Sequence, residues 1–523
     1  MRRRPADRSL DRRTPVEEGW ARRRRWRWLV VAVVAAAVVY WLVFVNEYVV
    51  AHEDDAEHFL HGSIGSEVAS GLPYLVFQAL PVLYEDRLDG EGYRHFGLLY
   101  AEADDDLPIG VSRRVAGGVE RVWLNCAVCH VGTYRLTPEA EPEFLLGAPA
   151  NNLRLRDFIL FLLEVGRDPG FNGERVVAAI QSDAVDADLN ALERVFYRRF
   201  VVPRVKSALL ELNDQLAFVA RQHDWGPGRV DTFNPYKSLQ LGFPMGPDAI
   251  DEIALNGAAD YPSIWRQRPR EGMNLHWDGN NDSVAERNLS AALGAGVTPR
   301  TVDRDRIHRV ADWAWDLPPP PFPAPETIDR ELAVEGAALY ADYCAACHGM
   351  ARPASDGDGE GYVYDYDRGR YPRLGEVETL AEIGTDRGRW ASYSEPFAAA
   401  QNMLYAGYDW RFERFRKTAG YANHPLDGIW ARSPYLHNGS VPTLRDLMEP
   451  AENRPTVFWR GSDVFDPERV GYRSDAEAAP RDDLFRYDTR VPGNGNAGHD
   501  GPRYGTDLPA AAKDAIVEYM KLL

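Results

Sequence analysis

The longest uninterrupted apolar stretch of the chain is Leu29–Val45, a run of seventeen residues near the N-terminus. The cluster Arg22–Arg25 stands just before it, and aromatic residues flank it on both sides. A bilayer core requires about 20 apolar residues, which this run approaches with its flanks. The pattern predicts a transmembrane helix over 28–45, with the Arg-rich tail 1–27 in the cytoplasm and all that follows exported.

A cleaved signal peptide ending near Ala51 is the alternative for this stretch. Its apolar core would be long for a signal peptide, and no A-x-A pattern follows it. An uncleaved anchor is therefore the favoured interpretation. It predicts an inner-membrane, single-pass protein with the bulk of the chain in the periplasm.

Farther along, apolar residues recur at helical spacing. The expected helices cover about 153–165, two segments within 183–222, 303–316, 327–350 and 508–523. Between the third and fourth of these regions, Pro318–Pro325 contains six prolines in eight residues, which cannot continue a helix. We therefore expect a mainly α protein with an N-terminal domain over 46–317, a linker over 318–325 and a C-terminal domain over 326–523.

The formal net charge of −19 is unevenly distributed. Residues 1–27 carry eleven Arg against four acidic residues, so the remainder is more acidic than the whole. A strongly acidic exported portion should repel nucleic acid, and could attract a basic redox partner. A generally acidic surface without such a partner explains the charge equally well.

All four cysteines fall in two C-x-x-C-H motifs. The first contains Cys126, Cys129 and His130, and the second contains Cys344, Cys347 and His348. This is the attachment signature of a c-type haem, with two thiols for the vinyl groups and an imidazole for the iron. The motifs predict two covalently bound haem c groups, one in each domain.

Three other uses of paired cysteines compete with haem attachment. Disulfides within each pair would not require the histidine that follows both of them. A zinc ribbon places its two pairs about 15–20 residues apart, far closer than these. A thioredoxin-like redox pair expects a βαβ context, which neither motif has.

Four further segments show a family resemblance. They are LHWDGN at 275–280, ERNLSAALGAG at 286–296, SPYLHNGSVPTL at 433–444 and GNGNAGHD at 493–500. The first and third resemble bacterial dihaem cytochrome c peroxidases, and the second and fourth resemble the related rubber oxygenases more closely. This resemblance implies two cytochrome c-like haem domains with long loops and insertions.

The resemblance also implies roles for individual residues. His130 and His348 become the proximal iron ligands, and Trp277 becomes a catalytic tryptophan between the two haems; a buried core tryptophan is the alternative. The peroxidase acid is missing, since the corresponding position lies near Val297. The oxygenase branch instead holds dioxygen in an apolar distal pocket, for which Leu289–Leu293 would suit.

The second haem requires a ligand on its other face. No methionine lies between Met448 and Met520, and His499 is the only histidine in that interval. We expect His499 to be this ligand, with His437 as the runner-up; a surface position in a Gly-rich turn is the alternative for His499.

A weaker pattern occurs at Asp356–Asp367, DGDGEGYVYDYD, which loosely follows a calcium-binding loop. A solvated acidic loop without Ca²⁺ is the competing interpretation.

Two functions follow from these features. The first is a membrane-anchored periplasmic dihaem oxidoreductase that activates O₂ or H₂O₂ at the first haem while the second haem relays electrons. The second is a pure electron-transfer cytochrome, without substrate turnover, that exchanges electrons with periplasmic or membrane partners. The large first domain favours the enzyme, and the missing peroxidase acid favours the carrier or the oxygenase branch.

Overall fold

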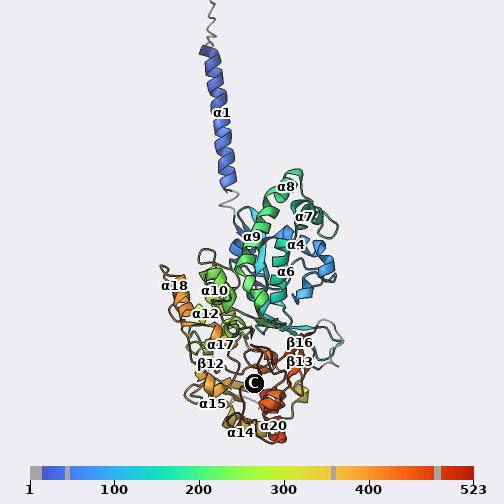
Figure 1. Cartoon of the computed structure of the whole chain (residues 1–523), viewed down its shortest axis with the longest axis vertical. Coiled ribbons are helices and arrows are strands. Elements are labelled where there is room, and N and C mark those ends of the chain that lie inside the picture. The colour runs from blue at the N-terminus through green and yellow to red at the C-terminus, as the bar shows by residue number, and fades with distance from the viewer. Residues whose placement is uncertain (1–14, 42–46, 355–360, 476–483) are drawn as a thin grey trace, which may run out of the picture.

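The computed structural model describes residues 15–41, 47–354, 361–475 and 484–523. The helix α1 (Pro15–Tyr40) stands off from a body that the rest of the chain forms (Figure 1). Within that body the first half of the chain lies nearer to α1, and the C-terminal helices lie at the opposite end (Figure 1).

The body alternates short helices with long connections. Before residue 318 its α-helices are α2 (Asp55–His61), α3 (Ser66–Ser70), α4 (Tyr74–Leu83), α5 (Ala127–His130), α6 (Leu155–Arg167), α7 (Gly173–Ile180), α8 (Ala191–Phe196), α9 (Val202–Gln215), α10 (Phe233–Leu241), α11 (Glu252–Leu255), α12 (Val284–Gly294) and α13 (Arg304–Asp316). After residue 325 they are α14 (Arg330–Tyr343), α15 (Ala345–His348), α16 (Leu380–Ile383), α17 (Gly388–Ser392), α18 (Glu395–Leu404), α19 (Leu444–Leu447) and α20 (Ala510–Met520).

The largest sheet in the described residues has four antiparallel strands in the order β1-β3-β4-β2. These strands are β1 (Tyr48–Val49), β2 (Leu72–Pro73), β3 (Val111–Ala116) and β4 (Val119–Leu124). The hairpin between β3 and β4 turns at Gly117 and Gly118, which both have positive φ. A two-residue turn of this kind matches the strand twist, and glycine adopts it without a steric penalty.

Two-stranded antiparallel ribbons make up the other sheets. They pair β5 (Val131–Tyr134) with β6 (Glu143–Leu146), β7 (Arg229–Val230) with β8 (Ala259–Asp260), β9 (Met350–Pro353) with β10 (Tyr362–Asp365), β11 (Val377–Thr379) with β12 (Gly420–Ala422), β13 (Val457–Arg460) with β16 (Phe485–Asp488), and β14 (Phe465–Asp466) with β15 (Gly471–Tyr472).

The expected fold class, a mainly α protein preceded by a transmembrane helix, is wrong. The structure is 44% helical and 13% strand, so it mixes helices with many short strands. Most of these strands have only two to four residues. Periodicity does not reveal such short segments, because they are shorter than the windows in which alternation can be recognised.

The predicted membrane span is the second error. Within the described part of the chain, no helix is both long and apolar enough to cross a membrane. The helix α1 begins at Pro15 and includes the Arg22–Arg25 cluster, so charged residues occupy much of its N-terminal half. Residues 42–45 of the predicted span lie outside the described residues.

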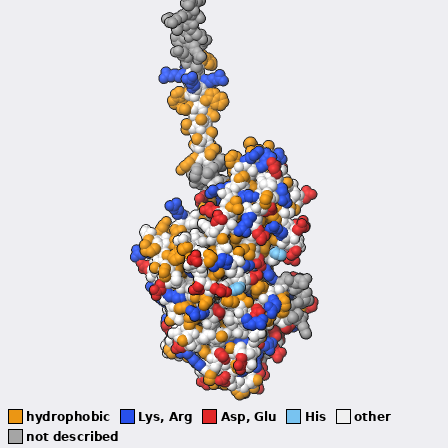
Figure 2. All heavy atoms as spheres, viewed as in Figure 1, with side chains coloured by type: hydrophobic (Ala, Val, Ile, Leu, Met, Phe, Trp, Pro, Cys, Tyr) orange, Lys and Arg blue, Asp and Glu red, His pale blue; other side chains and the backbone are white. Residues whose placement is uncertain are grey.

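The surface of the body combines charges of both signs. Acidic and basic side chains are interspersed on the face shown in Figure 2, whereas α1 exposes apolar side chains and arginines. The side chains of Trp26, Trp28 and Leu29 on α1 are all more than half exposed.

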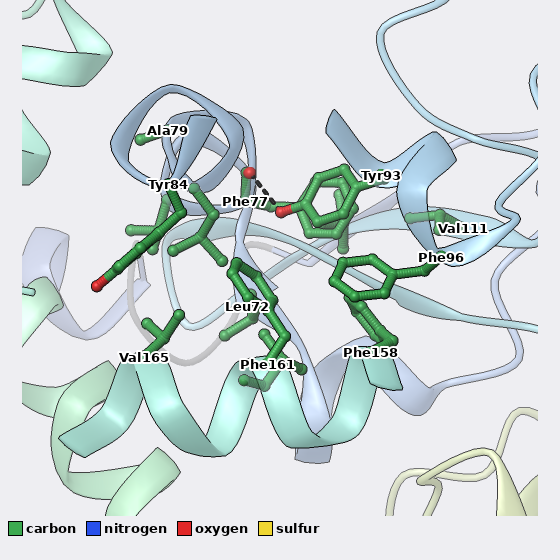
Figure 3. Packing of buried hydrophobic residues seen from close by; sticks show 14 of the residues in the cluster. Leu72, Phe77, Ala79, Tyr84, Tyr93, Phe96, Val111, Phe158, Phe161 and Val165 are labelled. Carbon is green, nitrogen blue, oxygen red and sulfur yellow. Dashed lines mark hydrogen bonds between the residues drawn. The ribbon is translucent and has the colours of Figure 1, made fainter. Parts of the chain in front are cut away.

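The core of the N-terminal half forms around α4 and α6 (Figure 3). Phe158 and Phe161 project from α6 towards Phe96, and Tyr93 stacks on Phe77 with ring centroids 4.1 Å apart. The Tyr93 hydroxyl donates a 2.7 Å hydrogen bond to the Phe77 carbonyl, which satisfies its only polar group inside this core.

A second core joins residues from both sides of the proline segment. Trp265 and Leu275 precede the segment, whereas Trp430 and Tyr519 follow it, yet all four belong to one buried cluster. Phe322, within the segment, is buried in the same cluster. The segment therefore packs on the body, and the domain boundary at 318–325 remains a prediction.

The helices α14 and α20 cross at very close range beside the second C-x-x-C-H motif. Gly336 on α14 makes this possible, because an added Cβ would lie 1.8 Å from the Ala515 carbonyl oxygen and 3.1 Å from the Tyr519 Cβ. Such a contact leaves no room for a side chain.

We expect Gly336→Ala to destabilise the protein by about 1–3 kcal/mol, because the helices must separate to admit the methyl group. The change in the free energy of unfolding can be measured by denaturant titration. Gly294→Ala is the matched control, since Gly294 is also helical but has nothing within 4 Å of the added Cβ. Equal stability of Gly336→Ala and the unaltered protein would contradict the close crossing.

Candidate haem sites

Each C-x-x-C-H motif forms one short helical turn. Cys126 and Cys344 are the N-cap residues of α5 and α15. The backbone amides of Cys129 and Cys347 donate to the Cys126 and Cys344 carbonyls at 3.3 and 3.1 Å. Because one turn of helix separates the two cysteines, both thiols lie on the same side of it. All four thiols are free, as covalent attachment to a haem requires.

The imidazole of His130 is held by a distant backbone carbonyl. Its Nδ1 donates to the Pro262 carbonyl oxygen at 2.9 Å. Burial is the main cause that lowers the pKa of His130 to about 4, so the ring is neutral at physiological pH. This tautomer leaves Nε2 as a lone-pair donor, which is the arrangement that metal-binding histidines usually have.

His348 is held in the same way. Its Nδ1 donates to the His424 carbonyl oxygen at 2.7 Å, and burial again lowers its pKa. In both motifs the histidine Nδ1 therefore donates to a distant backbone carbonyl, although Pro262 and His424 lie in unrelated segments of the chain.

The ring of His499 lies opposite His348. Their centroids are 6.1 Å apart and their planes differ by 22°. A metal–imidazole bond of about 2 Å, with about 1 Å more to the ring centroid, gives about 6 Å for two imidazoles on opposite sides of one metal ion. Burial lowers the pKa of His499 to about 3, so this ring is also a neutral donor.

These residues fit haem c at both motifs. Each site provides two thiols on one side of a helical turn and a neutral imidazole with a free Nε2. The second site also provides a second imidazole at the spacing of an axial pair. In the described part of the chain, no histidine ring lies opposite His130 in this way.

His437, the runner-up ligand, lies elsewhere. Its ring centroid is 4.3 Å from that of Tyr421, and its carbonyl accepts a hydrogen bond from the Asp260 amide at 2.9 Å. Its Nε2 is buried without a hydrogen-bond partner. The structure therefore brings His499, and not His437, to His348.

Trp277 lies between the segments that hold the two proximal histidines. Its Nε1 donates to the Asp260 carbonyl at 2.8 Å, two residues before Pro262. Its ring meets the ring of His424 edge-on at 5.8 Å. The His424 Nε2 in turn donates to the carbonyl of His276, the residue before Trp277, at 2.9 Å.

An apolar and aromatic cluster packs against Cys126 at the first site. It includes Leu289, Ala292 and Leu293 from the segment Leu289–Leu293 that was predicted to line an apolar pocket. These three side chains lie on one buried face of α12. The cluster also contains Ile64, Phe233, Tyr236, Val297, Ile307, Tyr393, Phe397, Ala398, Tyr405, Phe412 and Phe415. Val297, near the position where peroxidases have an acid, is fully buried in it.

The predicted calcium loop is only partly described, since Asp356–Glu360 lie outside the described residues. Its second half is not a loop, because Tyr362–Asp365 form the strand β10. Asp365 pairs with Arg352 and Arg370. No cluster of three or more His, Cys, Asp or Glu side chains that could hold a metal ion occurs in the described ranges.

Sequence patterns missed several residues that build the sites. His424 and Pro262 act through backbone carbonyls, and main-chain groups leave no signature in a sequence. The aromatic residues Phe233 and Phe397 lie far from the motifs along the chain. The sequence around His424 shows only a histidine near proline and glycine, and this pattern is too common to identify a functional residue.

Residues 420–460 match the family described as RoxA-like, cytochrome c-like. Two relatives come from Sinorhizobium fredii (strain NBRC 101917 / NGR234). The uncharacterised protein y4iJ is 27% identical over 89% of this chain and 91% of its own length. The uncharacterised protein y4iM is 33% identical over 50% of this chain and 64% of its own length.

The family match includes His424 and the segment SPYLHNGSVPTL. It supports a cytochrome c-like domain with haem c, and a role as a haem-containing oxidoreductase or electron-transfer protein.

We expect Cys126→Ala/Cys129→Ala and Cys344→Ala/Cys347→Ala each to retain one of two covalent haems, because each motif binds its haem through its own thiols. Intact-protein mass spectrometry and the pyridine haemochrome assay measure this content. A single haem in the unaltered protein would contradict the second attachment site.

Proposed function

We propose that this protein is a dihaem c-type oxidoreductase that activates dioxygen or peroxide at the first haem, while the second haem relays electrons. One observation carries the proposal. His348 faces His499 at the spacing of an axial pair, whereas His130 faces no histidine in the described part of the chain.

This difference in the number of imidazoles separates the two proposed roles, which are reaction with a small oxidant at the first site and electron transfer at the second. A haem held at each motif would supply redox chemistry, and a small oxidant would have access to it only where the protein does not provide a ligand on both faces. Two imidazoles at the second site suit electron transfer, because they block direct access. At the first site His130 would be the one imidazole to hold the haem among the described residues, so this site would be the one to accept an exogenous ligand.

The residues around the first site suit a small apolar ligand. Leu289, Ala292 and Leu293 belong to the buried cluster that packs against Cys126, together with several aromatic rings. The aliphatic side chains of this cluster exclude water, and its hydroxyl groups are those of Tyr236, Tyr393 and Tyr405. Val297 replaces a carboxyl group where peroxidases have one, which favours dioxygen over peroxide.

Trp277 contacts the segments that hold both histidines. The route runs from His130 to the Pro262 carbonyl, through the backbone to Asp260, and on to the indole Nε1. From the indole it crosses to the ring of His424, whose carbonyl holds His348. We assign Trp277 the role of electronic bridge.

We further propose that the protein works outside the cytoplasm, with a basic redox partner. The support for export is chemical, since covalent haem attachment of this type belongs to exported proteins of the family that the motifs resemble. The net charge of −19 supports a basic partner, and excludes nucleic acid as a favourable one.

We expect the fully reduced protein to bind one carbon monoxide per chain, because in the described part of the chain a second imidazole faces His348 but not His130. Optical titration against a known concentration of carbon monoxide measures the stoichiometry. Binding of none would favour the alternative, a pure electron carrier. Binding of two would show that His499 does not close the second site.

We expect Trp277→Phe to keep both haems but to slow electron transfer between them several-fold, because the hydrogen bond to Asp260 is lost and the ring is smaller. Flash photolysis of the half-reduced carbon monoxide complex measures the rate. Trp225→Phe is a control for the loss of a buried tryptophan. An unchanged rate in Trp277→Phe would assign Trp277 to packing alone.

A further inference from the structure

The loop that carries His499 has little structure of its own to hold it. Residues 493–501 read GNGNAGHDG, with four glycines in nine residues. His499 itself has φ of +49°, a left-handed conformation that non-glycine residues seldom adopt. A ligand on such a loop needs an external contact that fixes both the backbone and the direction of the ring.

Arg454 supplies that contact. Its side chain uses Nε, Nη1 and Nη2 to donate five hydrogen bonds, all to backbone carbonyls. The acceptors are Glu449 at 3.0 Å, Asn496 at 2.7 Å, Gly498 at 2.7 Å, Leu447 at 3.1 Å and His499 at 2.9 Å. Three of these carbonyls lie in the His499 loop, and two lie in the segment that leads from α19 to Arg454.

The nearby acids are engaged with other groups. Asp446 pairs with Arg469, and Glu449 pairs with Arg445 and Lys513. All five hydrogen bonds of Arg454 therefore go to carbonyl oxygens and none goes to a carboxylate. The residue is only 3% exposed. Burial lowers the pKa of Arg454 to about 10, so the guanidinium remains charged at neutral pH.

A lysine cannot replace this arrangement. A guanidinium presents five N–H donors in one rigid plane, whereas an ammonium has three donors around a point charge. At least two of the five carbonyls would then be buried without a partner, and the loop would lose part of its support.

We infer that Arg454 is the positioning residue that holds His499 at the second haem. This inference rests on the proposed axial role of His499 and adds the residue that makes it possible. It also places a buried positive charge next to the ligand loop, near the carboxylates of Asp500, Asp446 and Glu449, with none of which Arg454 forms an ion pair in the described residues.

The test compares Arg454→Lys with the unaltered holoprotein by optical and electron paramagnetic resonance spectra. We expect the low-spin signal of the second haem to fall at least several-fold, and added imidazole to restore it. Loss of general packing would not be repaired by an external ligand, so the rescue separates positioning from a merely structural role.

Arg460→Lys is the matched control. Arg460 is 4% exposed and also donates to two loop carbonyls, those of Asn438 and Gly439, but it makes no hydrogen bond to residues 496–499. We expect Arg460→Lys to keep the low-spin signal of the second haem, even if it lowers the stability of the protein.

Gly498→Ala tests the same loop from its other side, should Arg454→Lys fail to fold. An added Cβ at Gly498 would lie 2.7 Å from the Thr385 Cβ, so the loop must move while Arg454 stays intact. We expect the same loss of low-spin signal and the same rescue by imidazole.

His499→Ala separates the axial role of His499 from the positioning role of Arg454. If His499→Ala becomes high-spin while Arg454→Lys and Gly498→Ala both keep the native spectrum, Arg454 is not a positioning residue and the axial role of His499 stands. If His499→Ala keeps the native low-spin signal, the axial assignment itself is wrong, and the inference about Arg454 is wrong with it.

Discussion

The structure depends on a constraint that acts on the two proximal imidazoles. An imidazole can bind iron through Nε2 only if its proton sits on Nδ1, and a buried N–H needs an acceptor. Both histidines meet this need with backbone carbonyls far away in sequence, 132 residues from His130 and 76 residues from His348. The position of each imidazole therefore depends on the packing of distant parts of the chain.

The carbonyl partners also connect the sites to each other. Pro262 lies two residues after Asp260, whose carbonyl oxygen accepts a hydrogen bond from the Trp277 indole. The ring of His424 packs against the same indole. The contacts that orient the two ligands thus converge on one aromatic side chain. At the second site the proposed roles require one additional imidazole, His499, which is held through its backbone carbonyl because its buried Nδ1 has no hydrogen-bond partner among the described residues.

The sequence allowed the local parts of this arrangement to be predicted. Two C-x-x-C-H motifs predict their own ligands because all three residues lie within one helical turn, and His499 is predicted because it is the only histidine between Met448 and Met520. The carbonyls of Pro262 and His424 could not be predicted, since main-chain acceptors carry no residue signature. The fold class was wrong for a related reason: strands of two to four residues have no readable alternation. For the predicted membrane span, the described part of the chain contains no helix long and apolar enough to cross a membrane, and residues 42–45 of the span lie outside it.

The central claim is that the two sites differ in axial ligation, one open and one closed. Electron paramagnetic resonance of the fully oxidised holoprotein tests this claim most directly, because high-spin and low-spin ferric haems give separate signals that can be quantified. The account predicts one high-spin and one low-spin haem per chain, the low-spin signal arising from two nearly parallel imidazoles. Two low-spin haems with no high-spin component, or two high-spin haems, would contradict it.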